Sequence, residues 1–319
     1  MFVQILIMLA SLAAVLIGAD YLVDGSSAIG RKAGLSEFII GITIVGIGTS
    51  APEMAVSFVS AFSGNADIAV GNVVGSNIYN TFLILGITAI ISPLAITKEN
   101  LNRDIPVNII ATILFILLGL SGTIFGSGDD ILGRGDGAIL LVLFAAYMAI
   151  CFWSGKSDDS EEESDEKQIS IFKAIIMIVS GLAMLVVGGK FFVSSATEIA
   201  RLAHIPETFI AITIVAGGTS LPELATCIVA AFKGKDQLAL GNIIGSNIAN
   251  ILLILGGSAL ICPLSLQGIS MIDIGTLFLS AIFIFASAYL FKKGKLDRAE
   301  GVIFTLTEIA YVSWLIIQI

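Results

Sequence analysis

The sequence predicts an all-α integral membrane protein whose ten transmembrane helices form two inverted five-helix repeats, with helices broken at prolines. Three observations predict this fold. Apolar residues make up 56% of the chain and charged residues only 13%, whereas a soluble domain has about 25% charged residues. A segment of 53 residues occurs twice, and lysines and arginines are concentrated in alternate loops.

Ten apolar segments are long enough to cross a bilayer as helices, which takes about 20 residues. The first has no basic segment before it, so we expect a retained helix and not a cleaved signal peptide. The first and sixth are the longest, which predicts tilt or an extension beyond the bilayer. The predicted spans are residues 2–29, 38–62, 68–92, 104–123, 136–153, 171–200, 208–232, 238–262, 272–291 and 299–318.

The positive charges predict the orientation of these spans. Of the 16 lysines and arginines, 13 lie in or beside loops that follow odd-numbered spans. Loops rich in these residues face the cytoplasm. We therefore expect a multi-pass protein of the cell membrane with both termini outside and the odd-numbered loops in the cytoplasm.

An internal repeat relates the two halves of the chain. Residues 41–93 and 211–263 share 29 of 53 positions without a gap, at a shift of 170 residues. Because each half has five spans, the second half must enter the membrane in the opposite orientation, an arrangement typical of secondary transporters. We predict an N-terminal repeat at 1–153, an acidic cytoplasmic linker at 154–170 and a C-terminal repeat at 171–319.

A proline interrupts the second span next to a carboxylate. Pro52 lacks a backbone N–H and clashes with the preceding turn, so the helix should break before it and free carbonyl groups. Broken helices are tolerated in membranes where they line a polar cavity. Thr49 and Ser50 should share the face of Glu53. The seventh span repeats this arrangement with Thr219, Ser220, Pro222 and Glu223.

Polar residues recur every four positions along the third and eighth spans. Small and polar residues in membrane helices are usually packing residues, so each of them alone would be structural. Asn77 and Asn247 lie to one side of these polar stripes and could cap freed backbone groups. The stripes are Asn72, Ser76 and Asn80 in the third span and Asn242, Ser246 and Asn250 in the eighth.

The two glutamates differ from these neutral residues. A carboxylate at mid-membrane costs about 2.5–3.5 kcal/mol even on lenient scales and predicts a functional site. The second, third, seventh and eighth spans contain no basic residue, and Lys190 in the sixth is a possible partner in one half only. We therefore expect Glu53 and Glu223 to be neutralised by a bound cation or by protons.

The donor types predict the class of cation. Carboxylates, amides, hydroxyls and carbonyls are hard oxygen donors that suit Ca²⁺, Na⁺ or Mg²⁺. Mg²⁺ sheds its water reluctantly, which favours Ca²⁺ in a dehydrated site. With one histidine and three dispersed cysteines, a zinc site is not expected. No motif of an intramembrane enzyme is present, so we expect neither an enzyme nor a cofactor.

The motifs GTSAPE with GNVVGSNIYN, and GTSLPE with GNIIGSNIAN, resemble the two alpha repeats of the cation/Ca²⁺ antiporter superfamily, with the closest similarity to prokaryotic Na⁺/Ca²⁺ exchangers. The resemblance covers essentially the whole chain. It implies a secondary active antiporter that exchanges Na⁺, usually three ions, for one Ca²⁺. It also implies that the first and sixth spans slide as a gate.

The resemblance further implies a ligand set. Ca²⁺ would bind between Glu53 and Glu223 with carbonyls near Thr49 and Thr219, and Asn80 and Asn250 would line the centre. Na⁺ would use the same site and flanking ones. The flanking sites would be built with Ser50, Ser76, Ser220, Ser246 and carbonyls near Gly46 and Ala216.

Two alternatives to Na⁺/Ca²⁺ exchange stay open at this point. In an H⁺/Ca²⁺ antiporter the glutamates would carry protons, and a cation channel would need no counter-ion. Potassium-dependent relatives carry aspartate at the position of Asn250, so the amide argues against K⁺ co-transport. The expected partners are Ca²⁺, Na⁺ and the bilayer, with no nucleic acid and no obligate protein partner evident.

Overall fold

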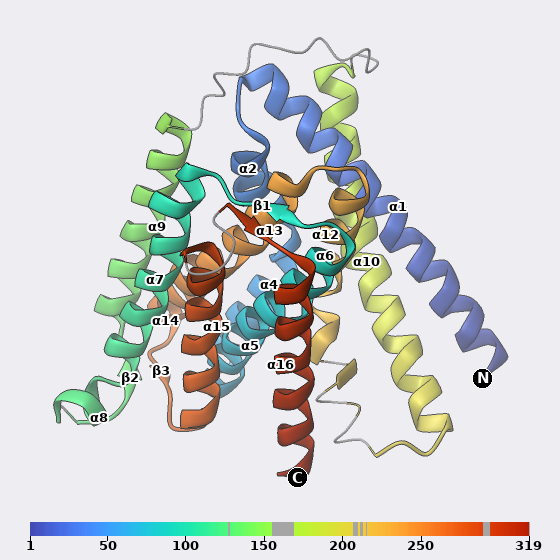
Figure 1. Ribbon diagram of the computed structural model, residues 1–319. Helices are drawn as coiled ribbons and strands as arrows, with labels where there is room; N and C mark the ends of the chain where they lie inside the picture. Colours follow the sequence, from blue (N-terminus) through green and yellow to red (C-terminus); the bar gives the residue numbers. More distant parts are fainter. Residues whose placement is uncertain are drawn as a thin grey trace.

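The fold is described from a computed structural model of the chain, shown in Figure 1. It describes residues 1–126, 128–154, 169–206, 210, 213–214, 216–289 and 294–318. The predicted acidic linker lies almost wholly outside these residues, so it stays a prediction.

Helices dominate both halves of the chain, and several membrane-crossing segments include π-helical turns labelled η. The first half comprises α1 (Phe2–Ala33), α2 (Glu37–Ile40), η1 (Gly41–Gly46), α3 (Ile47–Thr49), α4 (Ala51–Phe62), α5 (Ala66–Tyr79), η2 (Asn80–Leu85), α6 (Gly86–Ile91), β1 (Leu94–Ala95), η3 (Asn100–Asp104), α7 (Ile105–Gly119), α8 (Ser121–Phe125), β2 (Ile131–Leu132) and α9 (Arg134–Ser154). The second comprises α10 (Ile171–Leu202), the 3₁₀-helix η5 (Ala216–Gly218), α12 (Leu221–Phe232), α13 (Asp236–Ala249), η6 (Asn250–Leu255), α14 (Gly256–Ile261), β3 (Leu264–Ser265), α15 (Met271–Tyr289), β4 (Lys295–Leu296) and α16 (Arg298–Ile317).

The described part of the chain contains eight helices that are long and apolar enough to cross a membrane. A ninth span is the pair Glu37–Thr49 and Ala51–Phe62, which is bent by 49°. These nine match predicted spans. The predicted span 208–232 contains α12, and part of its first section lies outside the described residues. The tenth span therefore stays a prediction.

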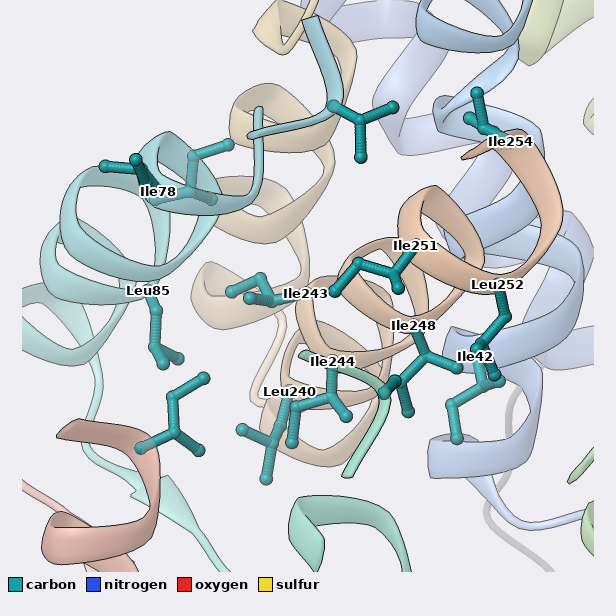
Figure 2. Packing of buried hydrophobic residues seen from close by; sticks show 14 of the residues in the cluster. Ile42, Ile78, Leu85, Leu240, Ile243, Ile244, Ile248, Ile251, Leu252 and Ile254 are labelled. Carbon is teal, nitrogen blue, oxygen red and sulfur yellow. The ribbon is translucent and has the colours of Figure 1, made fainter. Parts of the chain in front are cut away.

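Burial separates central helices from peripheral ones. In the segment Asp236–Ile261, 94% of the most apolar 18-residue window is buried, against 22% in α1 and α10. Figure 2 shows why: isoleucines and leucines of α13 and η6, including Ile243, Ile248 and Ile251, are surrounded by other helices. The peripheral helices leave large apolar side chains exposed, as expected where lipid is the solvent. The centre of the fold is thus α13 with η6 and α14.

The two longest helices, α1 and α10, cross at glycines. A Cβ atom at Gly18 would lie 2.8 Å from the carbonyl oxygen of Gly181, and one at Gly181 would lie 2.7 Å from that of Gly18. Small residues permit such close contact between membrane helices. Each helix has 32 residues, or about 48 Å at 1.5 Å per residue. The predicted excess length is confirmed, and both helices lie tilted at one side of the molecule (Figure 1).

Ion pairs tie α1 to the turn between α12 and α13. The Lys233 Nζ atom lies 2.6 Å from carboxylate oxygens of both Asp20 and Asp24, and Lys235 lies 3.8 Å from Asp24. Partial burial alone would lower the pKa of Lys233, but the two carboxylates outweigh it and raise that pKa. Lys233 therefore stays charged. Its ion pairs attach the turn between α12 and α13 to the half of α1 that is predicted to face the cytoplasm.

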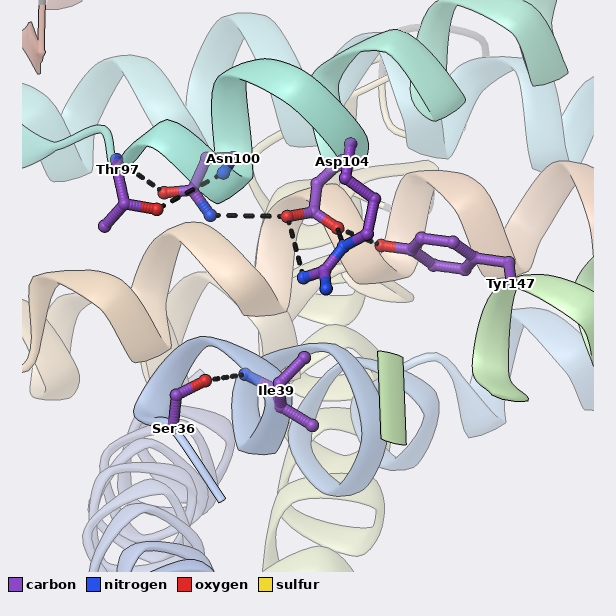
Figure 3. Close-up of polar contacts among 7 residues, drawn as sticks. Ser36, Ile39, Thr97, Asn100, Asp104 and Tyr147 are labelled. Atoms are coloured by element: carbon purple, nitrogen blue, oxygen red, sulfur yellow. Dashed lines mark hydrogen bonds and ion pairs between the residues drawn. The ribbon is translucent and has the colours of Figure 1, made fainter. Parts of the chain in front are cut away.

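A buried aspartate joins the fourth and fifth predicted spans (Figure 3). Asp104 accepts a hydrogen bond of 2.9 Å from the Tyr147 hydroxyl and an ion pair of 2.7 Å from Arg103. In the second half, the Tyr311 hydroxyl donates to Asp273 over 2.7 Å. The same tyrosine–aspartate bond thus fastens corresponding helices in both halves. A separate bond in the figure, from the Ile39 amide to Ser36, caps α2.

Four two-residue strands correct the prediction of an all-helical chain. Strand β1 pairs antiparallel with β4, and β2 pairs antiparallel with β3. Each pair joins a loop of one half to a loop of the other, because loop backbone groups that meet there satisfy each other's hydrogen bonds. Segments this short carry no recognisable sequence pattern. Figure 1 places β2 and β3 toward the end that carries both termini, and β1 toward the opposite end.

Corresponding glycines are packed differently in the two halves, which makes a matched test of this fold. Gly245 is buried, and a Cβ atom there would lie 2.6 Å from the Ile42 Cα atom. At Gly75, the equivalent position, a Cβ atom would meet no described atom within 4 Å. We expect Gly245→Ala to destabilise the protein by about 1–3 kcal/mol, because the backbone at Ile42 would have to move away from the added methyl group. Gly75→Ala should leave stability unchanged or slightly raised.

The measurement is the thermal unfolding midpoint of each purified variant in detergent. An equal fall in both variants would show that α13 does not pack against η1 as described.

Candidate cation-binding site

The predicted break in the second span is confirmed, and it lies at Ser50. This residue has φ −77° and ψ 10°, which ends α3, and α4 begins at the next residue with Pro52 in its first turn. Proline is well suited to a first turn because the N–H it lacks has no partner there anyway. Ser220 has φ −87° and ψ 9° before α12, which begins with Pro222 in the same place. The repeated motif therefore folds in the same way twice.

The two glutamates are held by serines of the opposite half. The Ser50 hydroxyl donates to Oε1 of Glu223, and the Ser220 hydroxyl donates to Oε1 of Glu53, each over 3.1 Å. Both glutamates are 1% exposed. These bonds cross between the halves and bring both buried carboxylates into one region, where like charges repel each other. An additional positive charge would relieve that repulsion.

Four oxygens of this region are buried without a hydrogen-bond partner among the described residues. They belong to the side chains of two glutamates and two asparagines, and each pair is related by the internal repeat. A buried acceptor left unpaired costs about 1–3 kcal/mol, and more if it is charged. Oxygens of this kind are the ligands that hard cations use. They are Oε2 of Glu53, Oε2 of Glu223, Oδ1 of Asn80 and Oδ1 of Asn250.

The two asparagines each begin a π-helical turn. Asn80 opens η2 and Asn250 opens η6, both in the middle of a long buried helix. Single π-helical turns in α-helices are frequent at functional sites. A change of helical pitch here redirects the side chains that follow Asn80 and Asn250.

The structure also places the remaining residues that were predicted to be ligands. Thr49 donates to Asn242 Oδ1 over 3.1 Å. The Ser246 hydroxyl donates to the Gly46 carbonyl oxygen over 3.1 Å, so two predicted ligand residues are bonded to each other. Ser76 is buried on α5. Thr219 interacts with Glu53 as Thr49 does with Glu223, and Ala216 begins η5.

No basic side chain in the described part of the chain pairs with either glutamate. Lys190, the one possible partner, is exposed on α10. The described residues also contain no group of three or more His, Cys, Asp or Glu side chains that could hold a metal ion. A cation bound here would therefore rely on two carboxylates together with neutral oxygens.

The structure shows polar residues whose part the sequence analysis missed. Asn77 and Asn247 hydrogen-bond to Asn250 and Asn80, and so act on the amides of the site as well as on backbone. Glu308 on α16 is another buried carboxylate, 4% exposed, in a predicted span. The internal repeat did not indicate this residue, because the first half has no glutamate at the equivalent position.

Comparisons with known proteins identify the family to which this chain is similar. A family profile described as "Sodium/calcium exchanger protein" matches residues 3–153 and 173–317. The putative antiporter CaxA of Alkalimonas amylolytica is 36% identical, and the sodium/calcium exchanger MaX1 of Methanosarcina acetivorans is 33% identical. The alignments cover 98% of both chains for CaxA and 97% of both for MaX1. A solved structure of the sodium-calcium exchanger NCX_Mj, soaked with 10 mM Na⁺ and zero Ca²⁺, matches with a TM-score of 0.83. Its sequence is 32% identical, and the match covers 98% of both chains.

Proposed function

Because the chain belongs to the sodium/calcium exchanger protein family, we propose that it exchanges Na⁺, three ions in each cycle, for one Ca²⁺ across the cell membrane. The observation that carries this proposal is the pair of buried, repeat-related glutamates, each with one oxygen held by a serine and the other unpaired. Such a pair needs a positive charge that no described residue supplies there.

Ca²⁺ suits this pair of carboxylates in charge and in donor type. Two carboxylates carry two negative charges, which one Ca²⁺ neutralises. Ca²⁺ takes about 6–8 oxygen ligands in flexible geometry. We assign Glu53, Glu223, and carbonyls near Thr49 and Thr219 to the Ca²⁺ shell.

Na⁺ would occupy the same region in a larger number of sites. Its candidate donors beyond the glutamates are hydroxyl, amide and carbonyl oxygens, which provide no formal charge and so suit a monovalent ion. We assign to these sites Ser50, Ser220, Ser76, Ser246, Asn80, Asn250 and carbonyls near Gly46 and Ala216. Three Na⁺ for one Ca²⁺ would move one net charge, worth about 2.3 kcal/mol for each 100 mV.

Alternating access would follow from the two repeats. Equivalent positions are packed differently: Gly245 is buried against Ile42, whereas Gly75 is exposed. A protein built from inverted repeats can exchange these two environments and so open the site to opposite sides in turn. We assign the gate to α1 and α10, which pack on each other through glycines. In this proposal the termini lie outside, residues 154–170 form a cytoplasmic linker, and 1–153 and 171–319 are the two repeats.

The first prediction concerns the counter-ion. Vesicles that contain the purified protein are loaded with Na⁺ and diluted into Na⁺-free medium with labelled Ca²⁺. We expect rapid Ca²⁺ uptake that requires internal Na⁺, because outward Na⁺ movement drives the exchange. Empty vesicles are the control. Equal uptake driven by a proton gradient without Na⁺ would instead show an H⁺/Ca²⁺ antiporter, and flux without any counter-ion would show a channel.

The second prediction concerns charge movement in the same vesicles. If three Na⁺ leave for each Ca²⁺ that enters, one positive charge leaves in each cycle. An inside-positive potential, set by a K⁺ gradient and valinomycin, should therefore speed Ca²⁺ uptake, and an inside-negative potential should slow it. Uptake that is indifferent to the potential would point to two Na⁺ per Ca²⁺.

The third prediction concerns the two carboxylates. Glu53→Gln and Glu223→Gln should each reduce Ca²⁺ uptake at least about 100-fold, because a buried charge left without its partner costs about 3–5 kcal/mol. Glu99→Gln, at an exposed position outside the site, is the matched control and should transport normally.

A thermal unfolding scan accompanies the flux measurement on the glutamate variants. Added Ca²⁺ should raise the unfolding midpoint of the wild type, as any ligand that binds only the folded state does, and should not raise it in the variants. Near-normal flux in either glutamate variant would remove that residue from the mechanism.

A further inference from the structure

We infer that Asn77 and Asn247 are positioning residues that turn the amide oxygens of Asn80 and Asn250 toward the ions. This inference rests on the proposed function and adds residues that determine which atoms the site presents. It is carried by a network of four hydrogen bonds that crosses between the two halves of the chain.

The orientation of Asn77 is decided by a backbone carbonyl. Its Nδ2 atom lies 3.1 Å from the carbonyl oxygen of Asn247, which can only accept a hydrogen bond. The amide must therefore point its nitrogen at that carbonyl, and its Oδ1 atom faces the other way. This oxygen lies 2.9 Å from Nδ2 of Asn250.

The orientation of Asn250 follows from that of Asn77. An amide oxygen accepts and cannot donate, so Asn250 must present its nitrogen to Asn77. Its own Oδ1 atom is then turned away, where it is buried with no partner among the described residues. Three groups in sequence thus fix one oxygen: the Asn247 carbonyl fixes Asn77, and Asn77 fixes Asn250.

The other half contains a corresponding bond. Asn247 Oδ1 accepts from Nδ2 of Asn80 over 3.2 Å, and Asn247 Nδ2 donates to the Thr81 hydroxyl over 3.0 Å. Oδ1 of Asn80 is again buried and unpaired. Because a hydroxyl can also donate, Asn247 is fixed less firmly than Asn77. Its loss should therefore have the smaller effect.

The orientation matters because the two ends of an amide have opposite polarity. An oxygen turned to the ions is a ligand, whereas an NH₂ group would repel a cation. An aspartate would present oxygen in either orientation, but it would add a third negative charge. The positioning residues therefore let a neutral side chain act as an oxygen ligand.

This difference between amide and carboxylate provides the test. Asn77→Ala removes the acceptor that holds the Asn250 nitrogen, so the amide can turn its NH₂ group toward the ions. One hydrogen bond contributes about 0.5–1.5 kcal/mol, and 1.4 kcal/mol is a tenfold change in affinity. We expect a KM for Ca²⁺ up to about tenfold higher than in the wild type, with little change in the maximal rate.

The decisive measurement repeats the substitution in the Asn250→Asp background. A carboxylate needs no orientation, and Asn77 Oδ1 would repel it, so Asn77→Ala should leave KM unchanged or lower it there. A residue that only supports the fold would raise KM by the same factor in both backgrounds. Asn247→Ala with and without Asn80→Asp is the matched experiment in the other half.

The outcomes separate this inference from the proposed function. If wild-type vesicles fail to exchange Na⁺ for Ca²⁺, the proposed function is wrong. If they exchange, but Asn77→Ala and Asn247→Ala each change KM equally in both backgrounds, the function stands and the positioning role is wrong. Should either single variant fail to fold in a thermal scan, the pair in the other half decides the question.

Discussion

The rest of this structure depends on one constraint, which is the cost of holding two carboxylates in a membrane with no basic partner among the described residues. Each glutamate alone costs about 2.5–3.5 kcal/mol at mid-membrane, and their mutual repulsion adds to that. The protein offsets part of the cost with one serine hydroxyl for each carboxylate, given by the opposite half. It leaves the second oxygen of each unpaired. Carboxylate oxygens without hydrogen-bond donors favour cation binding more strongly than oxygens that already accept hydrogen bonds from the protein.

That constraint explains where the fold departs from regular helices. The proline breaks place each serine and glutamate on adjoining helix ends, and the π-helical turns begin at the two central asparagines. Contacts between the halves accumulate around these irregularities: Ser246 on the Gly46 carbonyl, Thr49 on Asn242, and the asparagine network. The buried isoleucines and leucines of α13 pack among other helices (Figure 2). The irregular backbone is therefore confined to the region where protein, and not lipid, surrounds it.

The features that could be predicted from the sequence are those in which one residue type has few physical interpretations. Pro52 in an apolar span implied a break, which the structure confirms. Glu53 without a nearby lysine implied a bound cation or protons, which stays a prediction. The difference between Gly75 and Gly245 could not be predicted, because the motifs around them are nearly identical and packing is set by the conformation of the whole molecule. The strands β1–β4 are too short to show a pattern. Asn77 stood off the polar stripe, and its role depends on one carbonyl of the other half, which no spacing within a helix could indicate.

In the proposed site, a repeated sequence would provide two kinds of ligand. The glutamates would supply charge, and each accepts one hydrogen bond from a serine of the opposite half. Asn80 and Asn250 supply only dipoles, and these must be aimed, so each is held by a partner that is itself held. The more firmly fixed series of hydrogen bonds runs from the Asn247 carbonyl through Asn77 to Asn250. It begins at a backbone carbonyl, which can only accept a hydrogen bond. A neutral ligand in a low-dielectric site is useful only if its orientation is fixed. The proposed positioning role would account for a second asparagine, three residues earlier, in each copy of the motif.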